Sequence, residues 1–476
     1  MYKRFERIHF TGIGGVGMSG IAEVLNNLDY DVAGSDLKES DTTSRLRKLG
    51  ISINIGHRAE NIKGAHVVVI SSAVSPDNPE VEEARRQSIP VIPRAEMLAE
   101  LARLKYGVLV AGAHGKTTTT SLVASVLGDG RLDPTVVIGG KLKGIGSHAK
   151  LGQGDFLVAE ADESDGSFLK LTPTIAVVTN IDREHLDFFK NISEIKEAFL
   201  SFINKVPFYG LCILYGDNGY IQELIPKIER RFITYGLTEG LDLVAKDIKT
   251  KGLKSDFEAI LNGKSLGSFE VPLIGAHNVC NCLAAIAVAN ELGMDIDDIR
   301  RGLANFSGVH RRFEFKGNVT DINVIDDYGH HPAEIMATLR AAKDSILQGT
   351  GNGTGNLEKQ RGKGRLIVLF QPHRYTRTRD LLSEFFDVFT DADKVILMDI
   401  YPAGEKPISG INSEALLRGI RDRKKETFHM KDRMEIIDFL GDELREGDTL
   451  LTLGAGDVWK IGEEFLKVKG VKQKGC

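Results

Sequence analysis

The segment Gly107-Val-Leu-Val-Ala-Gly-Ala-His-Gly-Lys-Thr-Thr-Thr-Thr120 decides the fold of the middle of the chain. It begins with an apolar run, Val108 to Ala111, that is typical of a short buried strand. A glycine-rich loop follows, and beyond Lys116 the spacing of the apolar residues predicts a helix from Thr118 to Leu127. This order of elements binds phosphate groups, because backbone N–H groups and the positive end of the helix face the anion.

The loop is shorter than the common phosphate-binding pattern. In G-x-x-x-x-G-K-[ST] a glycine would stand at position 110, where this chain has Val110. The alternative is a glycine-rich turn whose lysine extends along the surface. The flanking strand and helix favour nucleotide binding, in which the lysine reaches the terminal phosphates and the next hydroxyl meets Mg²⁺. The candidate ATP-binding residues of the loop are Gly112, Ala113, His114, Gly115, Lys116, Thr117 and Thr118.

Length and composition limit the possible classes of protein. A chain of 476 residues is too long for one hydrophobic core and is expected to form several domains. With 61 basic and 66 acidic residues the net charge is −5, which gives no electrostatic argument for a nucleic-acid partner. No apolar run is long enough to span a membrane, and residues 1–5 lead directly into a strand and not into a signal peptide.

The cysteines indicate the compartment. Cys212, Cys280, Cys282 and Cys476 have neither the spacing of a zinc site nor that of a disulfide framework. Free thiols persist in a reducing environment, so we expect a cytoplasmic protein.

The first 105 residues carry a second phosphate-binding signature. Gly12, Gly14 and Gly17 follow a predicted strand and fit G-x-G-x-x-G, and a helix is predicted over residues 18–28. Asp36 lies about 20 residues beyond the loop, where an acid that binds a ribose would lie. Alone, the pattern indicates a dinucleotide; more generally, it indicates a pyrophosphate at the N-terminus of a helix.

Other polar residues follow strands in the same region. His57 comes after a strand at residues 51–55, and Ser71 comes after a buried strand at residues 67–70. Parallel sheets bind ligands at such carboxyl ends. A lone histidine is more often structural, so the residues alone leave the role of His57 open.

Residues 106–307 are expected to form a second domain around the phosphate loop. A strand at residues 156–159 ends in Glu160, where an acidic run begins. An acid at this position beside a phosphate loop is the usual second anchor for Mg²⁺, and the alternative is a solvated acidic loop. Further along, His277, Asn278 and Asn281 open an apolar helix, where they either cap its start or read the edge of a nucleobase.

Residues 308–476 alternate strands and helices, which indicates another parallel α/β sheet. Two segments of polar and basic residues, 326–332 and 371–377, come directly after predicted strands, where a site would form. The glycine-rich segment 349–364 is interpreted as a mobile surface loop, and the basic tail from residue 467 as frayed.

Three functions account for parts of this pattern. An enzyme that uses ATP to join two substrates would use the phosphate loop, the acidic Mg²⁺ site, the first fingerprint and the basic third region. A GTPase-type switch is suggested by Thr179-Asn-Ile-Asp182, but no clean Asp-x-x-Gly switch follows the loop, and Ile181 does not fit the guanine-reading motif. An NAD oxidoreductase would explain the first region and leave the phosphate loop unused.

Taken together, these residues resemble the ATP-dependent Mur ligases over nearly the whole chain. Any single motif is weak, whereas the ordered set is specific. The motifs are residues 12–20, 112–119 and 160–165, Thr179-Asn180 with His185, residues 207–210, His277-Asn278 with Asn281, and residues 310–313, 327–332 and 371–377.

The resemblance implies an α/β protein of three domains. Residues 1–105 would form a Rossmann-like domain for a UDP-sugar, residues 106–307 a central P-loop ATPase-like domain, and residues 308–476 a Rossmann-like domain for an amino acid. The implied reaction is ATP-dependent ligation of L-alanine to UDP-N-acetylmuramate through an acyl phosphate, with release of ADP and phosphate, in peptidoglycan precursor synthesis. The first fingerprint would then bind the UDP-sugar, with contacts from Gly14, Gly15, Val16, Gly17, Ser35, Asp36, His57 and Ser71.

The same resemblance assigns roles to further residues. The implied catalytic residues are Lys116, Glu160, His185 and His330, and the implied Mg²⁺ ligands are Thr117, Glu160 and His185. Asn281 would read adenine, Asp327 would bind the ribose, and Arg312 would face the ATP phosphates. The amino acid would be bound by His330, His373, Arg374 and Arg377, since a guanidinium meets a carboxylate in a two-pronged fork.

Two departures from the family pattern stand out. Ala113 replaces the usual threonine, which affects one side-chain contact, and the segment 349–364 lengthens a loop of the third domain. We expect small-molecule substrates and a monomer or weak dimer. The sequence leaves open the identity of the general base and the discrimination between L-alanine, glycine and L-serine.

Overall fold

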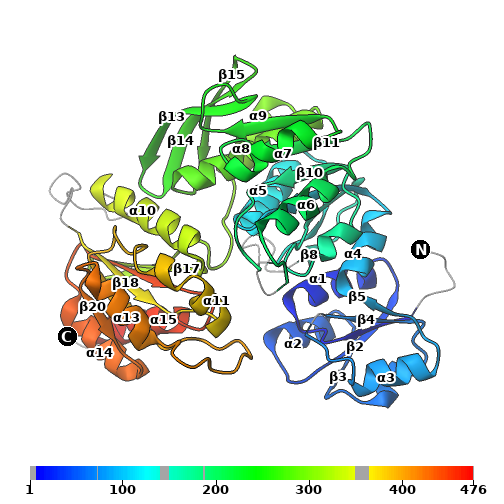
Figure 1. Cartoon of the computed structure of the whole chain (residues 1–476), viewed down its shortest axis with the longest axis horizontal. Helices are drawn as coiled ribbons and strands as arrows, with labels where there is room; N and C mark the ends of the chain where they lie inside the picture. The colour runs from blue at the N-terminus through cyan, green and yellow to red at the C-terminus, as the bar shows by residue number, and fades with distance from the viewer. Residues whose placement is uncertain (1–6, 72, 140–148, 186–187, 349–363, 475–476) are drawn as a thin grey trace. The chain divides into compact units, whose positions relative to one another are not determined.

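The computed structural model describes residues 7–71, 73–139, 149–185, 188–348 and 364–474 (Figure 1). Its contacts divide the chain into two compact units. Unit 1 comprises Met1–Lys246, Glu258–Phe269 and Cys280–Val309, and unit 2 comprises Asp247–Phe257, Glu270–Val279 and His310–Cys476. Apart from Gly364, the predicted mobile loop lies outside the described residues. The prediction of a frayed tail was wrong as far as residue 474, because that segment is helical.

The first sheet of unit 1 is parallel, with the strand order β3-β2-β1-β4-β5. Its strands are β1 (Arg7–Thr11), β2 (Asp31–Asp36), β3 (Ser52–Ile55), β4 (Val67–Ile70) and β5 (Val91–Pro93). The helices of this region are α1 (Val16–Asn27), α2 (Asp41–Lys48), α3 (Pro79–Arg86) and α4 (Arg94–Ala102). The order reverses between β1 and β4, and the crevice at this switch point is where such sheets bind ligands.

The second sheet has the order β15-β14-β13-β12-β11-β10-β6-β9-β7-β8. Its strands are β6 (Tyr106–Ala111), β7 (Thr135–Val137), β8 (Ala149–Lys150), β9 (Phe156–Glu160), β10 (Ile175–Val178), β11 (Leu211–Tyr215), β12 (Phe232–Gly236), β13 (Leu243–Lys251), β14 (Lys254–Leu261) and β15 (Lys264–Val271). Its helices are α5 (Lys116–Asp129), α6 (Ile192–Ile203), α7 (Gly219–Leu224), α8 (Ala276–Glu291) and α9 (Ile296–Ala304). Strand β6, which precedes the phosphate loop, lies between β9 and β10, so the polar residues after all three strands meet at one edge.

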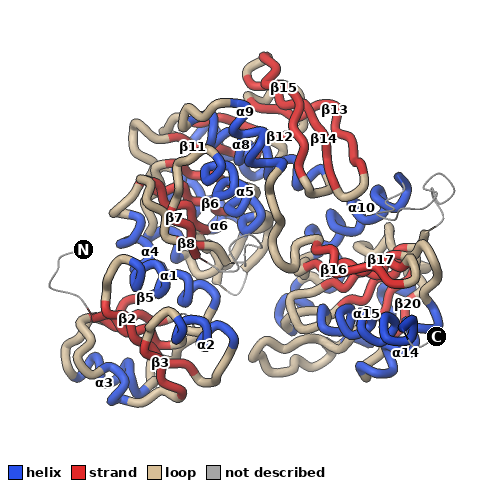
Figure 2. Tube along the Cα trace, turned by 180° about the vertical axis from the view of Figure 1, so that it is seen from behind, coloured by secondary structure: helices blue, strands red, loops and turns tan. Residues whose placement is uncertain are grey.

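Strands β11 to β15 were not predicted from the sequence. The clearest missed signal is Asn262-Gly263, which joins β14 to β15 and has positive φ at both residues, 49° and 77°. This pair is the preferred two-residue turn of a β-hairpin, because both positions need a left-handed backbone. The three long strands of this extension, β13 to β15, are visible beside one another in Figure 2.

The sheet of unit 2 has the order β16-β17-β21-β18-β19-β20 and is parallel except for the edge strand β16. Its strands are β16 (Glu314–Val319), β17 (Ile322–Asp327), β18 (Leu366–Phe370), β19 (Lys394–Leu397), β20 (Thr427–His429) and β21 (Thr449–Leu453). Side chains of α10 (Pro332–Gln348), α12 (Leu382–Phe385) and α13 (Ser413–Asp422) share one apolar cluster with the strands or border it, and α11 (Tyr375–Asp380) precedes α12. Those of α14 (Arg433–Glu443) and α15 (Trp459–Lys474) share the other apolar cluster with the strands.

Two features of the described chain concern its environment. Cys212, Cys280 and Cys282 are buried free thiols. Within the described ranges, no helix has the length and apolar character needed to cross a bilayer.

A glycine sets the packing of α9 against α5. A Cβ added to Gly302 would lie 2.7 Å from the Cα of Val126, whereas one added to the exposed Gly128 would meet nothing within 4 Å. We expect Gly302→Ala to lower the free energy of unfolding by about 1–3 kcal/mol, the usual cost of overpacking. Gly128→Ala should raise it, by at most about 1 kcal/mol, because alanine favours the helix. Thermal or denaturant unfolding of both variants checks this, and equal effects would exclude steric packing as the cause.

Candidate active site

The phosphate loop has the backbone that its glycines predict. Gly112 and Gly115 have φ angles of 141° and 78°, which side chains disfavour. A Cβ at Gly112 would lie 2.1 Å from Thr179 Oγ1, and one at Gly115 would lie 2.9 Å from Asn281 Oδ1. The close neighbours and the positive φ angles therefore leave no room for a side chain at either position. The loop leads into the N-terminus of α5.

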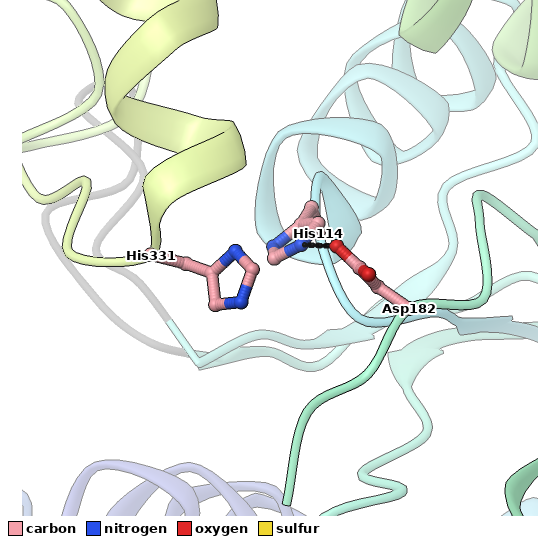
Figure 3. Close-up of side chains that lie close together, drawn as sticks. All are labelled: His114, Asp182 and His331. Carbon is pink, nitrogen blue, oxygen red and sulfur yellow. Dashed lines mark hydrogen bonds and ion pairs between the residues drawn. The ribbon is translucent and has the colours of Figure 1, made fainter. Parts of the chain in front are cut away.

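The segment after β10 holds the loop in place. His114 N donates to Asn180 Oδ1 at 2.8 Å, while Asn180 Nδ2 and Thr179 Oγ1 both donate to His114 O, at 3.0 and 2.6 Å. The His114 ring is bonded through Nε2 to Asp182 Oδ2 at 2.9 Å (Figure 3). Thr179, Asn180 and Asp182 thus brace the phosphate loop, which differs from the guanine-reading role that a GTPase would need.

The ammonium group of Lys116 lies among acidic side chains. Its ammonium donates to Glu163 Oε1 at 2.7 Å and to the carbonyl of Gly112. Burial alone would lower the pKa of Lys116, but the carboxylates of Glu163 and Asp162 raise it by more than burial lowers it. The net shift is upward, so the side chain is charged. For Asp162, burial alone would raise the pKa, but the charge of Lys116 and a hydrogen bond from Ser164 lower it to about 2. This part of the site is therefore a fixed set of charges at neutral pH.

Arg94 links this acidic cluster to the first fingerprint, and sequence analysis missed it. Its Nη2 donates to Asp162 Oδ2 at 2.9 Å. A Cβ added to Gly17 would lie 2.1 Å from Arg94 Nη1, so the guanidinium lies directly against the first turn of α1. No local motif surrounds Arg94, and its two contacts come from distant segments, which explains why the pattern alone did not reveal it.

The predicted Mg²⁺ ligands lie around the same loop. Thr117 is the second residue of α5, and Glu160, the last residue of β9, accepts a hydrogen bond from Gly139 N at 2.7 Å. His185 Nε2 lies 3.4 Å from Glu163 Oε1 and 3.7 Å from Glu184 Oε2. Glu163 therefore links Lys116 to His185, a role that the sequence did not reveal.

The oxygen atoms of this cluster suit a hard cation. Among the described side chains, Glu163 Oε2 is buried and has no hydrogen-bond partner. Carboxylate and hydroxyl oxygens are the ligands that Mg²⁺ prefers, and Thr117 at the start of α5 and Glu160 at the end of β9 offer two more of them. The residues present therefore fit the ion that the phosphate loop implies.

The predicted UDP-sugar contacts gather at the carboxyl edge of the first sheet. Asp36 Oδ2 accepts from Gly14 N at 2.8 Å, and Ser35 O accepts from the N–H groups of Gly12 and Ile13. The Ser35 hydroxyl is fully buried and lies 2.9 Å from His57 Nδ1. Of the remaining predicted contacts, Gly15 precedes α1, Val16 and Gly17 begin it, and Ser71 Oγ lies 3.7 Å from the Cβ position of Gly12.

Two residues that were predicted to contact ATP, Asn281 and Asp327, accept hydrogen bonds from other residues of the chain. Asn281 Oδ1 accepts from Thr119 Oγ1 at 3.0 Å. In unit 2, the Asp327 carboxylate accepts from the N–H groups of Gly329 and Phe313, both at 2.7 Å. Burial raises the pKa of Asp327 to about 6, and the charge of Arg312 opposes this rise. Whether these side chains bind adenine and ribose stays a prediction.

The predicted amino-acid residues form a cationic cluster in unit 2. His373 stacks on Tyr401 with 5.6 Å between ring centroids and lies 5.7 Å from the ring of His330. Arg377 Nη1 lies 3.3 Å from His373 Nδ1. Burial, His330 and the arginines Arg377 and Arg374 lower the pKa of His373 to about 3, so its ring is neutral at physiological pH.

The sequence left open whether these arginines pair with a local acid such as Asp380. Asp380 accepts from Arg379 Nε at 2.7 Å. Burial would raise the pKa of the Glu405 carboxyl, but hydrogen bonds from Thr376 and the charge of Arg374 lower it, so an acid lies near Arg374.

Comparison with known proteins places these features in a family. The chain matches the models described as "Mur ligase family, catalytic domain" at residues 7–106, "Mur ligase middle domain" at residues 110–289 and "Mur ligase, glutamate ligase domain" at residues 311–456. It is 56% identical to a UDP-N-acetylmuramate–L-alanine ligase of Geotalea daltonii, over 98% of this chain and 99% of that protein. The corresponding protein of Geobacter sulfurreducens is 55% identical over 98% of each chain.

A solved structure agrees with this result. The UDP-N-acetylmuramate–alanine ligase of Thermotoga maritima superposes with a TM-score of 0.81 at 29% sequence identity, covering 98% of this chain and 99% of that one.

The contact between Glu163 and His185 can be tested by titration. Burial lowers the pKa of His185, but the hydrogen bond to Glu163 and the charge of Glu184 raise it more, so the net shift is upward. The pair therefore contributes stability that is present below the ordinary pKa of histidine and is lost as the pH rises through the raised value. Glu163→Gln should lower the pKa of His185, measured by NMR titration of the imidazole. Glu184→Gln, which keeps the Glu163 contact, should lower it less; the reverse order would contradict the assignment.

Proposed function

Because the chain belongs to the Mur ligase family, we propose that it uses ATP to join L-alanine to the carboxylate of UDP-N-acetylmuramate. The products are the alanyl conjugate, ADP and phosphate, and the reaction belongs to peptidoglycan precursor synthesis. The observation that carries the proposal is the run of charges from Lys116 through Asp162 to Arg94. It joins a phosphate loop to a second anion-binding loop, as a transfer between ATP and a nucleotide-sugar requires.

The chemistry explains why two anion sites must be connected. A carboxylate is a poor electrophile, so it is activated by accepting the γ-phosphoryl group of ATP, which gives an acyl phosphate. The amine of L-alanine then attacks the carbonyl carbon, and the tetrahedral intermediate collapses with loss of phosphate. The first step brings two anions together, so its rate depends on cations at the point of transfer.

The residues of the loop divide this work. The N–H groups at the start of α5 and the Lys116 ammonium bind the phosphates, and Lys116 exchanges its partner Glu163 for a phosphate oxygen. Thr117 and Glu160 would hold Mg²⁺, together with the unpartnered oxygen of Glu163. When bound, the ion neutralises charge on the transferred group. His185, which the sequence also assigned to the metal, orients Glu163 through its ring nitrogen.

The cationic cluster of unit 2 would bind L-alanine. Arg374 and Arg377 attract its carboxylate, and His330 and His373 border the same loop. His373, with a pKa of about 3, is a poor acceptor for the ammonium proton at neutral pH. This leaves His330 as the histidine of the pair that can take part in proton removal.

The family models also support the proposed domain division at residues 1–105, 106–307 and 308–476. We place the protein in the cytoplasm, because the buried free thiols of Cys212, Cys280 and Cys282 suit a reducing compartment. We further propose that it is a monomer or weak dimer.

The function as a whole is tested by phosphate release. Purified protein with ATP, Mg²⁺ and UDP-N-acetylmuramate should release phosphate when L-alanine is added, and a panel with glycine and L-serine measures selectivity. Phosphate release that needs no UDP-N-acetylmuramate would contradict the proposal.

Lys116 separates the two anion sites experimentally. Lys116→Ala should lower phosphate release on the order of 10²–10³-fold or more, because it removes a cation from the point of phosphoryl transfer. Binding of UDP-N-acetylmuramate, measured by calorimetry, should change little, since that ligand is assigned to the first sheet. A variant that loses binding of the sugar nucleotide but keeps turnover would overturn the domain assignment.

Arg377 tests the site for the amino acid, and Arg379 is its matched control. Arg377→Ala should raise the KM for L-alanine on the order of 10-fold, because a charge-assisted pair is lost. Arg379→Ala removes the same charge from the same helix, but from a pair with Asp380, and should leave this KM unchanged. Alaninamide, which lacks the carboxylate, should be a poor substrate for both the wild type and Arg377→Ala. Equal increases in the KM for ATP, UDP-N-acetylmuramate and L-alanine would contradict a role specific to the amino acid.

A further inference from the structure

A buried carboxylate lies beneath the carboxyl edge of the first sheet. Glu80, in the first turn of α3, has no exposed surface. Its Oε2 accepts from Thr11 Oγ1 and Ser35 Oγ, both at 2.7 Å, and lies 3.0 Å from His9 Nε2. Its Oε1 accepts from Asn61 Nδ2 at 2.6 Å. Nothing in the sequence marked Glu80, because these partners come from three separate segments of the chain.

The hydrogen bonds keep Glu80 ionised. Burial alone would raise the pKa of this carboxyl, but the hydrogen bonds from His9, Thr11 and Asn61 lower it to about 2. An ionised carboxylate can only accept hydrogen bonds. Each neighbour at hydrogen-bond distance must therefore supply a proton to it.

This requirement fixes the proton on the next residue in the chain of contacts. The Ser35 hydroxyl has one proton, and it is donated to Glu80 Oε2. Ser35 Oγ also lies 2.9 Å from His57 Nδ1. Because its only proton is already donated, Ser35 Oγ can only accept from His57, so His57 Nδ1 must carry a proton. In a neutral imidazole the other nitrogen, Nε2, is then an acceptor.

His57 is the member of this relay that can meet a ligand. Thr11 and Ser35 are fully buried, whereas the His57 side chain is 13% exposed. It follows the end of β3, beside the end of β2, at the edge where the UDP-sugar is assigned. Within the described part of the chain, Nε2 of His57 has no hydrogen-bond partner.

We propose that Glu80 is a positioning residue that acts through Ser35 to fix His57 as the Nδ1–H tautomer, so that His57 Nε2 accepts a hydrogen bond from the nucleotide of the UDP-sugar. The inference rests on the proposed function for the identity of the ligand. The group recognised is a hydrogen-bond donor, and uridine diphosphate offers two kinds, the N3–H of uracil and the ribose hydroxyls.

The tautomer is measured directly in the wild-type protein. Histidine ¹⁵N spectra at neutral pH, with the His57 signals assigned by a His57→Gln variant, should show the proton on Nδ1. A proton on Nε2 of the neutral ring would overturn the relay. This result does not depend on any ligand, so it remains decisive even if the protein binds another nucleotide.

A matched pair of variants separates the relay from simple structural support. Ser35→Ala and Thr11→Val each remove a buried hydroxyl that donates to the same oxygen at 2.7 Å, but only Ser35 contacts His57. By calorimetry, Ser35→Ala should weaken binding of UDP on the order of 10-fold, as expected for one hydrogen bond. Thr11→Val should keep the affinity within about 2-fold and keep the Nδ1–H tautomer. Equal losses of affinity in both variants would reduce Glu80 to a structural role.

Ligand analogues identify the donor. If uracil N3–H is the partner, 3-methyluridine diphosphate should bind the wild type more weakly than UDP and should lose little further in His57→Leu. If a ribose hydroxyl is the partner, the corresponding deoxyribose analogue should behave in this way. His57→Gln, whose amide oxygen is also an acceptor, should retain more affinity than His57→Leu. A wild type that binds ATP but not UDP would contradict the proposed function, whereas normal UDP binding with no loss in His57→Leu would contradict only the relay.

Discussion

The ion pair between Lys116 and Glu163 is the interaction on which the phosphate loop depends. Both side chains are largely shielded, with 17% of the lysine and 3% of the glutamate side chain exposed. Removing one member of such a pair leaves an uncompensated charge, at a typical cost of about 3–5 kcal/mol. The lysine is therefore stable only next to an anion. A bound phosphate can replace the carboxylate as that anion, and this exchange frees the carboxylate for a cation.

Carboxylates that orient a loop recur in all three sheets. Asp36 accepts from Gly14 N, Asp327 accepts from Gly329 N and Phe313 N, and Glu163 accepts from Lys116. In each case the acid lies at or just beyond the carboxyl end of a parallel strand, and its partner lies in a loop or at the start of a helix at the same edge. Parallel strands bring their carboxyl ends together at one edge of the sheet. The hydrogen bonds to these acids therefore hold several loops beside one another at that edge. The acids that a motif reading assigns to ligands thus also hold the backbone of the site.

The sequence predicted those parts of the structure that rest on local patterns. The apolar run before Gly112, the glycines and the helix after Lys116 are consecutive, so the strand, loop and helix could be read directly. The fingerprint at residues 12–17 and the alternation of strands and helices in residues 308–476 are of the same kind. Asn262-Gly263 is an equally local hairpin signal, although the strands on either side of it were not predicted.

The remaining parts of the site depend on contacts between distant residues. Arg94 meets Asp162 across 68 positions, and Glu80 meets Thr11 and Ser35 across 69 and 45. No spacing rule connects such residues, because the fold and not the local backbone brings them together. Burial also changes the chemistry of residues that the sequence did identify, as with Ser35, whose hydroxyl is enclosed between Glu80 and His57.

The field of the cationic cluster has a consequence for the second half of the proposed reaction. L-alanine must lose a proton before its amine can attack, and its ammonium is the main form in water at neutral pH. Like charges disfavour a protonated cation, which is one reason that the pKa of His373 falls to about 3 beside Arg374 and Arg377. An ammonium bound next to the same guanidinium groups would experience the same repulsion, while its carboxylate is attracted. The arginines would therefore both bind the amino acid and lower the pKa of its amine, which reduces the demand on any general base.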